Sequence, residues 1–259
     1  MEREWYAHFN DDEKAFVDKA WDWIKRAEDH HAVKRTDFLD PRQCHILTTL
    51  ANRADVHVRQ DGGYEGAERK RAVITPDYRD PAAEEIGIKV LAVTSADSRF
   101  NSLDHGDFMG AILSLGIKRD RIGDIHVIGH ACHILVAEEI AEYFSMNLTQ
   151  VHRVGVSTTL LPLAGLTTAQ VQLEEMGLSV ASLRLDGIAS DVWRLSRAKI
   201  LLPIKAGRCK LNWKAEEDPS RLLKEGDVVS LQGFGRFKVL EIEGVTKKGR
   251  MRVRVGKYV

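Results

Sequence analysis

The residues between Ser196 and Lys214 have the types and the spacing needed to bind phosphate groups. Because side chains alternate between the two faces of a β-strand, a strand over 208–214 would separate two chemically different sets. The outward set is Arg208, Lys210, Asn212 and Lys214. The inward set is Cys209, Leu211 and Trp213. Cationic side chains form strong charge-assisted hydrogen bonds to phosphate oxygens. The pattern therefore indicates binding of a polyanion and not a catalytic site.

A short basic helix is expected to precede this strand. Ser196 is a favoured N-cap residue, and Gly207 is suited to ending the helix in the left-handed conformation. The polar positions associated with this helix are Ser196, Arg197, Lys199 and Lys205. Pro203 interrupts the pattern, because proline removes a helical hydrogen bond and clashes with the preceding turn. A second short strand, 227–231, is predicted after the turn at Gly226.

The last part of the sequence carries a second set of cations. Lys247 and Lys248 are followed by Arg250, Arg252 and Arg254, with Met251, Val253 and Val255 between and after the arginines. Period-two alternation places the three arginines on one strand face and the apolar side chains on the other. Such a face could bind RNA, or it could simply keep an exposed strand soluble.

The charge is distributed unevenly along the chain. The formal net charge is zero, with 38 basic and 38 acidic residues among the 259. Residues 182–259 nevertheless contain 18 lysines and arginines against 9 aspartates and glutamates. An asymmetry of this kind indicates that one end of the chain meets a polyanion.

Three histidines raise the alternative of a metal site. His126, His130 and His133 fall on two predicted strands and the turn between them. No cysteine or carboxylate cluster completes a tetrahedral set around them, and Cys132 would point to the face opposite His133. We interpret them as ordinary hairpin histidines and expect neither a metal nor a cofactor.

The competing class is an RNA-modifying enzyme, and Asp186 is the residue that could serve it. A pseudouridine synthase needs a catalytic aspartate, which the run Arg184-Leu185-Asp186 offers. The residues after Asp186 are, however, accounted for by the binding fold, and an aspartate early in a helix is favoured by the helix dipole or pairs with a nearby arginine. No glycine-rich loop of the methyltransferase type is present. A binding protein, not an enzyme, is therefore expected.

The first 80 residues predict an N-terminal module of helices and a hairpin. Apolar residues at helical spacing predict a helix over 12–30, and Asp40-Pro41 predicts the start of another that reaches Asn52. Strands are expected at 56–60 and 69–75. The basic run Glu68-Arg69-Lys70-Arg71 could touch phosphate or could be a solvated strand end.

Residues 81–160 follow the order strand, helix, strand, strand, helix, strand. The expected strands are 86–94, 124–128, 132–136 and 151–159, and the helices are 104–115 and 137–146. This βαββαβ order is that of ferredoxin-like domains, the architecture shared with RNA-recognition motifs. Those motifs stack bases on strand aromatics, which residues 124–136 lack. Any RNA contact here would depend on cations such as Lys118, Arg119 and Arg121.

Two helices, about 185–193 and from Arg197, lead into the cationic strand, and here the sequence resembles the RNA-binding domain of ribosomal protein S-four. The resemblance rests on Arg184-Leu185-Asp186, Ser196-Arg197-Ala198-Lys199, Lys205 to Asn212, and Gly226-Asp227. It implies one RNA-contacting surface, which prefers structured RNA. Together with the three arginines of the C-terminal alternation, the predicted RNA-contact residues are Arg184, Ser196, Arg197, Lys199, Lys205, Arg208, Lys210, Asn212, Lys214, Arg250, Arg252 and Arg254.

Across essentially the whole chain the sequence also resembles the bacterial YlmH proteins. That likeness rests on Thr36 to Arg42, Glu68 to Ala72, Gly116 to Asp120, Gly123 to Ile125 and Ser182 to Asp186. It implies work on the large ribosomal subunit, with rRNA and tRNA as partners, in quality control of stalled translation. An adaptor that docks a protein through its acidic first half is compatible with this function.

The expected protein is thus an α+β chain of three modules. They are an N-terminal α/β module (1–80), a ferredoxin-like middle domain (81–160) and, after a connector (161–181), an S-four-type domain (182–259). No apolar run approaches the roughly 20 residues that span a bilayer, and the charged start has no signal segment. Widely spaced cysteines indicate a reducing compartment. We expect a monomer off the ribosome, in the cytoplasm or in the plastid stroma of a photosynthetic eukaryote.

Overall fold

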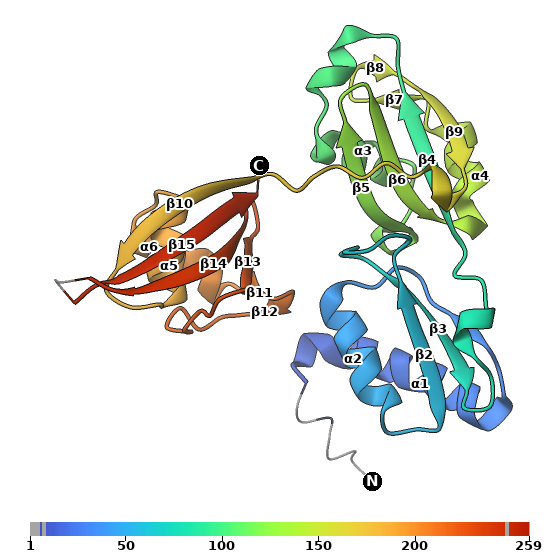
Figure 1. Cartoon of the computed structure of the whole chain (residues 1–259), viewed down its shortest axis with the longest axis horizontal. Coiled ribbons are helices and arrows are strands. Elements are labelled where there is room, and N and C mark those ends of the chain that lie inside the picture. The colour runs from blue at the N-terminus through green and yellow to red at the C-terminus, as the bar shows by residue number, and fades with distance from the viewer. Residues whose placement is uncertain (1–5, 7–8, 247–248, 259) are drawn as a thin grey trace. The chain divides into compact units, whose positions relative to one another are not determined.

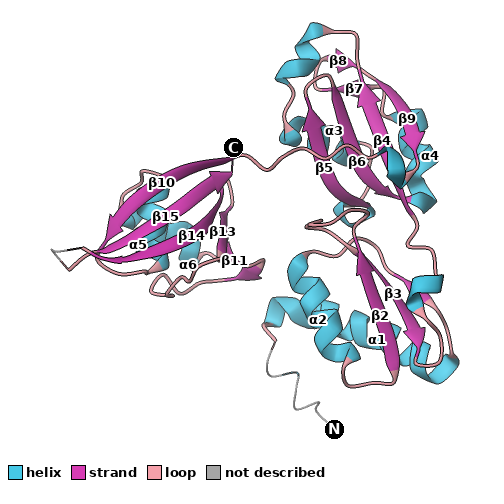
Figure 2. Cartoon of the chain, viewed as in Figure 1, coloured by secondary structure: helices cyan, strands magenta, loops and turns pink. Residues whose placement is uncertain are grey.

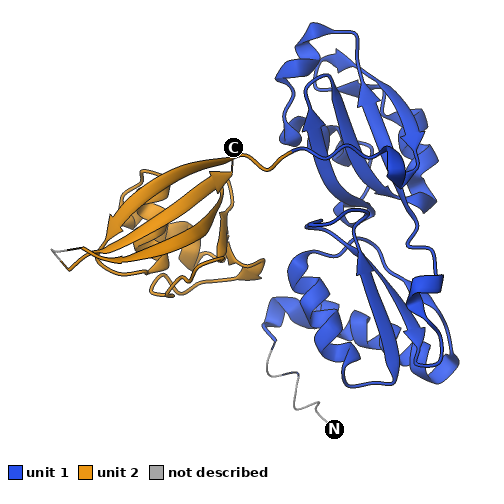
Figure 3. Ribbon diagram, in the orientation of Figure 1, with its two compact units in different colours: residues 1–169 blue, residues 170–259 orange. Residues whose placement is uncertain are grey.

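The computed structural model describes residue 6, residues 9–246 and residues 249–258 (Figure 1). The chain divides into two compact units, residues 1–169 (unit 1) and residues 170–259 (unit 2) (Figure 3). Both units mix helices with antiparallel sheets (Figure 2), which confirms the predicted α+β class. No helix within the described ranges is long and apolar enough to cross a membrane.

Unit 1 begins with two helices packed on a small sheet. The helices are α1 (Lys14–His30) and α2 (Pro41–Ala51), and the strands are β1 (Lys34–Arg35), β2 (Val56–Asp61) and β3 (Arg71–Pro76). The strand order is β1-β3-β2. As predicted, Asp40 caps α2: its side chain accepts from the Gln43 backbone N–H, and the Gln43 side chain accepts from the Asp40 N–H, a capping box. Leu47 and Leu50 of α2 share a buried core with Ile24 of α1 and Ile74 of β3.

The rest of unit 1 is built on a four-stranded antiparallel sheet in the order β5-β6-β4-β9. Its elements are β4 (Ile88–Thr94), α3 (His105–Ser114), β5 (Ile122–Ile128), β6 (Ala131–Ala137), α4 (Glu138–Asn147) and β9 (Ser157–Leu161). These elements occur in the predicted βαββαβ sequence. Phe108 of α3 and Phe144 of α4 are fully buried with Leu91 and Ile134, so both helices cover one face of the sheet.

The predicted strand over 151–159 is wrong in its extent. A small hairpin, β7 (Gln150–Val151) and β8 (Val154–Gly155), occupies its first half, and β9 starts only at Ser157. His152 adopts a left-handed φ of 52° at the hairpin turn. A histidine adopts this conformation more readily than a β-branched residue does, but it gives no strong turn signal in a sequence.

Unit 2 is a six-stranded antiparallel sheet with two helices packed on it. The helices are α5 (Leu185–Val192) and α6 (Arg197–Lys205). The strands, in sheet order, are β10 (Leu173–Val180), β15 (Met251–Tyr258), β14 (Gly235–Val245), β13 (Val228–Leu231), β11 (Cys209–Leu211) and β12 (Lys214–Ala215). Ile188 and Ile200 of the helices are buried with Val229, Phe237 and Val253 of the strands.

Half of the segment expected to be a connector, 161–181, is part of unit 2. Residues Leu173–Val180 form β10, which pairs with β15 over its full length, from Leu173 opposite Tyr258 to Val180 opposite Met251. The partner strand lies more than 70 residues further along the chain, so no local pattern identifies this pairing. The C-terminal sheet therefore begins earlier than Ser182.

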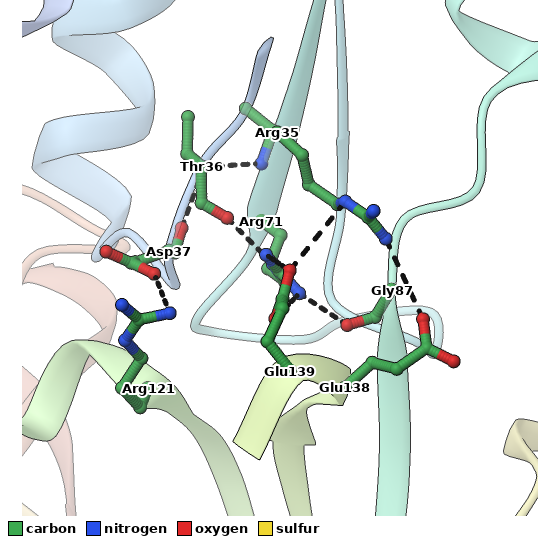
Figure 4. A network of polar contacts seen from close by, with 9 residues as sticks. Arg35, Thr36, Asp37, Arg71, Gly87, Arg121, Glu138 and Glu139 are labelled. Atoms are coloured by element: carbon green, nitrogen blue, oxygen red, sulfur yellow. Dashed lines mark hydrogen bonds and ion pairs between the residues drawn. The ribbon is translucent and has the colours of Figure 1, made fainter. Parts of the chain in front are cut away.

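A buried arginine joins the first two modules of unit 1 (Figure 4). The side chain of Arg71, on β3, is 2% exposed. Its Nε donates to the carbonyl oxygen of Thr36 at 2.7 Å, one Nη donates to the carbonyl oxygen of Gly87, and both Nη atoms contact the Glu139 carboxylate at 2.8 and 3.0 Å. The guanidinium thus connects a strand of the N-terminal sheet to α4 and to the entry of β4.

Replacing Arg71 by alanine should destabilise unit 1. The change leaves the Thr36 carbonyl without the donor that Arg71 supplies, removes one of two donors to the Gly87 carbonyl, and leaves Glu139 with Arg35 at 3.8 Å. Removing the donor of a buried acceptor costs about 2 kcal/mol. Urea unfolding of the full chain, followed by circular dichroism, measures the change. Arg79→Ala is the matched control, because Arg79 is half-exposed and its ion pair with Glu84 is worth less than about 1 kcal/mol. Equal stabilities of the two variants would contradict this role for Arg71.

Candidate functional site

Asp186 organises the arginines at the start of α5. Its carboxylate is 5% exposed and accepts from Arg184 Nε at 3.0 Å and from Arg184 Nη2 at 3.1 Å. Arg197 approaches from the start of α6, where its Nη2 lies 3.3 Å from the place that a Cβ on Gly187 would occupy. A side chain at Gly187 would therefore crowd the Arg197 guanidinium.

Electrostatics keep Asp186 ionised. Burial raises the pKa of its carboxyl, but the hydrogen bonds and charge of Arg184, the N–H of Gly187 and the charge of Arg197 together hold the pKa below its ordinary value. A buried, ionised carboxylate fixes the Arg184 guanidinium in one orientation. The prediction that Asp186 pairs with a nearby arginine is confirmed.

Helix α6 has the predicted limits and presents its cations outward. Ser196 caps it by accepting from the Lys199 backbone N–H, and Gly207 follows its end with φ 68°. Pro203 lies inside the helix but is buried against the core, and the helix continues to Lys205. The exposed cations of this helix are Arg197, Lys199 and Lys205.

The predicted seven-residue strand over 208–214 is wrong, because the chain turns back in the middle of it. Strand β11 ends at Leu211, and β12 pairs back on it, with Lys214 opposite Leu211. Asn212 and Trp213 form the turn, with left-handed φ values of 50° and 64°. Two positive φ values are what a two-residue hairpin turn requires; Asn is common there, whereas Trp is not.

This turn changes the place of two predicted contact residues. The Asn212 amide donates to Asp227 Oδ1 at 2.8 Å, and its oxygen accepts from the Val228 N–H at 2.9 Å. Its side chain therefore holds the hairpin against β13. Lys214 lies on β12, at the edge of the sheet, and is half-buried.

Arg208 and Lys210 line a hollow of about 430 Å³ on unit 2. Its lining residues are Gly207, Arg208, Lys210, Ser230, Leu231, Gln232, Gly233, Gly235 and Arg236. They include three cations and no carboxylate; Glu217 lies at one margin, 3.2 Å from a Cβ built on Gly207. Lys210 pairs with Ser230, and Ser230 pairs with Arg236, so these three form one row across β11, β13 and β14. We call these lining residues the cationic hollow.

Arg236 is not among the residues predicted from the sequence. Its guanidinium lies over the Tyr258 ring, 4.6 Å from the centroid. The signal that could have identified it is the alternation Arg236-Phe237-Lys238-Val239, in which Phe237 and Val239 are buried. That alternation places Arg236 on the face away from the core, in the row with Lys210.

Arg250, which precedes β15, and Arg252 and Arg254 on β15 are not among the residues of the cationic hollow, and two of the three are engaged by neighbouring strands. Val253 and Val255 are buried and Arg252 and Arg254 exposed, as the alternation predicts. Arg250 donates to the Ser179 carbonyl, and Arg254 pairs with Glu241 and, at 3.5 Å, with Glu175. Two strands separate β15 from β11, about 14 Å along the sheet. Lys247 and Lys248 lie outside the described residues.

The basic residues that the sequence offered in unit 1 are mostly structural. Arg69 donates to the carbonyl oxygens of Phe38 and Ile122, and Arg119 donates to those of Ile122 and Gly123. Burial lowers the pKa of both guanidinium groups, that of Arg119 to about 10. Arg121 pairs with Asp37 at 3.0 Å. Together with the buried Arg71, this leaves Lys70 and Lys118 as the cations of these two runs without such an assigned role.

The face of the four-stranded sheet that α3 and α4 leave open is covered by other parts of unit 1. Val90 and Leu135 of this face are fully buried against Phe38 and Val73, and Leu163 and Leu166 pack on the same cluster. The segment 162–169 then continues across the sheet (Figure 1). The surface on which RNA-recognition motifs stack bases is therefore occupied by the chain itself.

Two histidines hold this segment in place. His126 and His133 are directly opposite each other on β5 and β6. His133 Nδ1 accepts from the Thr167 N–H at 2.9 Å, and His126 Nδ1 accepts from the Ala169 N–H at 3.2 Å. Nδ1 of each ring must be unprotonated to accept a hydrogen bond. Burial lowers the pKa of both imidazoles, which favours this state. No group of three potential metal ligands occurs in the parts of the chain that the structure describes.

The three cysteines are buried, and their thiols are in environments that make them unreactive. Cys44, Cys132 and Cys209 are free thiols. Burial raises the pKa of Cys44 to about 11 and that of Cys209 to about 12, and it raises the pKa of Cys132 as well. Since the thiolate is the reactive form, none of the three has the environment of a catalytic nucleophile.

Comparisons with known proteins match all parts of the chain. Residues 12–79 match the family model "YlmH, N-terminal", and residues 81–164 match "Putative RNA-binding domain in YlmH". The Ribosome-associated protein quality control protein P2 of Bacillus subtilis (strain 168) is 40% identical over 248 residues, 96% of each chain. The solved structure of Cell division protein ylmH from Streptococcus pneumoniae is 28% identical and superposes with a TM-score of 0.53, covering 61% of this chain and 95% of the other.

The two histidines should make stability depend on pH. Their pKa is lower in the folded state than the value of about 6.5 in an unfolded chain, so their contribution is complete above pH 6.5 and declines as the pH falls below it. Carboxylates titrate mostly below pH 5, which leaves a window between pH 6.5 and 5.

We expect the free energy of unfolding to decrease across this window and to decrease less in His133→Gln. Urea unfolding at several pH values measures this, with His45→Gln, an exposed histidine on α2, as control. A pH profile of His133→Gln identical to that of the unmodified protein would contradict the assignment.

Proposed function

The chain belongs to the YlmH family, and from this premise we propose that it is a non-catalytic factor that binds structured RNA on the large ribosomal subunit. The observation that carries the proposal is the grouping of cations on unit 2. Arg184 pairs with Asp186, Arg197 lies close to Gly187, and Arg208, Lys210 and Arg236 line the cationic hollow. Fixed guanidinium groups suit phosphate contacts, which supply much of the affinity for nucleic acids.

One relative supports the ribosome as the place of action. The B. subtilis relative is named for ribosome-associated protein quality control. We propose that this chain also acts on stalled translation, with rRNA and tRNA as its RNA partners, as a monomer off the ribosome and in the cytoplasm. The S-four-type domain, here extended to residues 170–259, would provide the RNA contacts, and the modules 1–80 and 81–169 would form one supporting unit.

The environment of Asp186 favours binding over RNA modification. Both of its oxygens accept from Arg184, and its side chain is buried. A catalytic aspartate must reach its substrate, whereas this one is used to hold an arginine. Turnover of an RNA substrate that is lost in Asp186→Asn would support an enzyme instead.

Replacing Arg197, Arg208 and Lys210 together by alanine should weaken RNA binding strongly without unfolding the protein. Each lost phosphate contact reduces the slope of log K against log[salt] by about 0.7–0.9, so the slope should become less steep by about 2. Fluorescence anisotropy with labelled rRNA hairpins and co-sedimentation with large subunits measure both effects.

The matched control replaces three exposed cations of unit 1, Lys19, Arg26 and Arg53, and changes the net charge equally. Thermal melting of both triple variants verifies folding. Unchanged co-sedimentation of the unit 2 variant, or an equal loss in the control, would overturn the proposed site.

The ion pairs of Arg254 lead to a separate prediction. Because its charge is offset by Glu175 and Glu241, Arg254→Ala should change RNA affinity by less than about twofold, whereas Arg208→Ala should weaken it several-fold. The same anisotropy titration compares them. A larger loss for Arg254→Ala would place the RNA contact on β15.

A further inference from the structure

The turn between β13 and β14 holds an aromatic ring out of the core. It runs Gln232-Gly233-Phe234-Gly235 and is closed by the Phe234 N–H donating to the Leu231 carbonyl at 2.9 Å. Gly233 and Gly235 have φ values of 85° and 91°, a conformation that glycine adopts without strain. A Cβ built on either glycine would meet nothing within 4 Å, and the Phe234 side chain is 42% exposed.

The Phe234 ring is supported from behind by other aromatic rings. Its centroid lies 6.2 Å from that of Trp193, with the planes inclined at 52°. Trp193 in turn packs edge-on against Phe237, at 5.2 Å and 68°, and Phe237 is fully buried. This row of rings fixes the orientation of Phe234 while leaving a large part of its surface to solvent.

The same turn forms one wall of the cationic hollow. Gln232, Gly233 and Gly235 line the hollow, and the Gln232 N–H donates to the Arg208 carbonyl at 3.1 Å. Phe234 is not itself a lining residue and its ring packs on Trp193, but the turn that carries it borders the hollow that three cations line. Positive grooves that follow the backbone, combined with aromatic rings that stack bases, are the combination used to bind unpaired nucleotides.

We propose that Phe234 stacks on an unpaired base of an RNA whose neighbouring phosphate lies in the cationic hollow. The inference rests on the proposed RNA-binding function and narrows its substrate class. In a continuous A-form helix the faces of the bases are stacked on one another, so a stacking ring can use only a bulge, a loop or an end. The preferred RNA is thus structured and has an unpaired nucleotide next to a helix.

The test compares three hairpin RNAs that differ at one position. The first carries a single bulged 2-aminopurine, the second lacks the bulge and is fully paired, and the third has an abasic site in place of the bulged base. Binding is measured by anisotropy at low ionic strength, where phosphate contacts alone give affinity, and stacking is measured by quenching of 2-aminopurine fluorescence.

The full-length protein should bind the bulged hairpin about tenfold more tightly than the paired or abasic ones and quench its fluorescence. Phe234→Ala should lose this preference and the quenching, with unchanged affinity for the paired hairpin. Phe234→Trp should retain both. Val245→Ala, which truncates another exposed apolar residue of unit 2, should behave like the unmodified protein.

Phe234→Leu separates stacking from simple covering of Trp193, because leucine keeps apolar cover but has no π-face. If Phe234→Leu binds and quenches as the unmodified protein does, stacking is overturned. Equal affinity of the unmodified protein for all three hairpins, or a Phe234→Ala variant that still prefers the bulge, also overturns it, as expected if the ring docks a protein instead. If no hairpin binds, and the variant with Arg197, Arg208 and Lys210 replaced co-sediments with large subunits as the unmodified protein does, the proposed function itself fails.

Discussion

A single buried guanidinium sets the organisation of unit 1. Arg71 donates to two backbone carbonyls and a carboxylate that come from three different segments of the chain, so separating the N-terminal sheet from the βαββαβ sheet would break its contacts with Gly87 and Glu139. Asp124 adds to this junction: its carboxylate accepts from the Tyr64 hydroxyl and from the N–H groups of Glu68 and Arg69. Most cations of the runs 68–71 and 118–121 make structural contacts at this junction and are not available to a polyanion.

The same junction determines which surfaces remain for function. Phe38, Val73 and the segment 162–169 cover the open face of the βαββαβ sheet. This is the face on which RNA-recognition motifs stack bases, and here it is not exposed. Unit 2 also presents cations, and here Asp186 orients Arg184 and short strands bring Lys210 and Arg236 into one row. This is why we propose that RNA binds to the unit whose net charge is positive.

The elements with strong local signals could be predicted from the sequence, and those that depend on distant partners could not. Helices α1, α2 and α6 follow from apolar spacing, from the Asp40 cap and from the Ser196 and Gly207 limits. The hairpin at Asn212 and Trp213 was missed because tryptophan carries no turn signal. The role of Arg71 depends on a carboxylate 68 residues away, and β10 depends on β15. In the candidate site, Arg184 and Arg197 could be named from sequence. Arg236 becomes significant only when the strands place it in one row with Lys210, and Phe234 only when its turn borders the hollow.

The strand order of unit 2 has a consequence for how the protein is made. Strand β15, which follows every other strand of unit 2 along the chain, is an interior strand that lies between β10 and β14 and contributes Val253 and Val255 to the core. Until Tyr258 has left the ribosomal exit tunnel, β10 has no partner and the sheet has a gap in its middle. Unit 1 can complete its core during translation, whereas unit 2, which carries the candidate RNA-binding residues, can fold only after its final strand is released. A newly made molecule therefore acquires its structure in two steps, and the proposed binding surface belongs to the second.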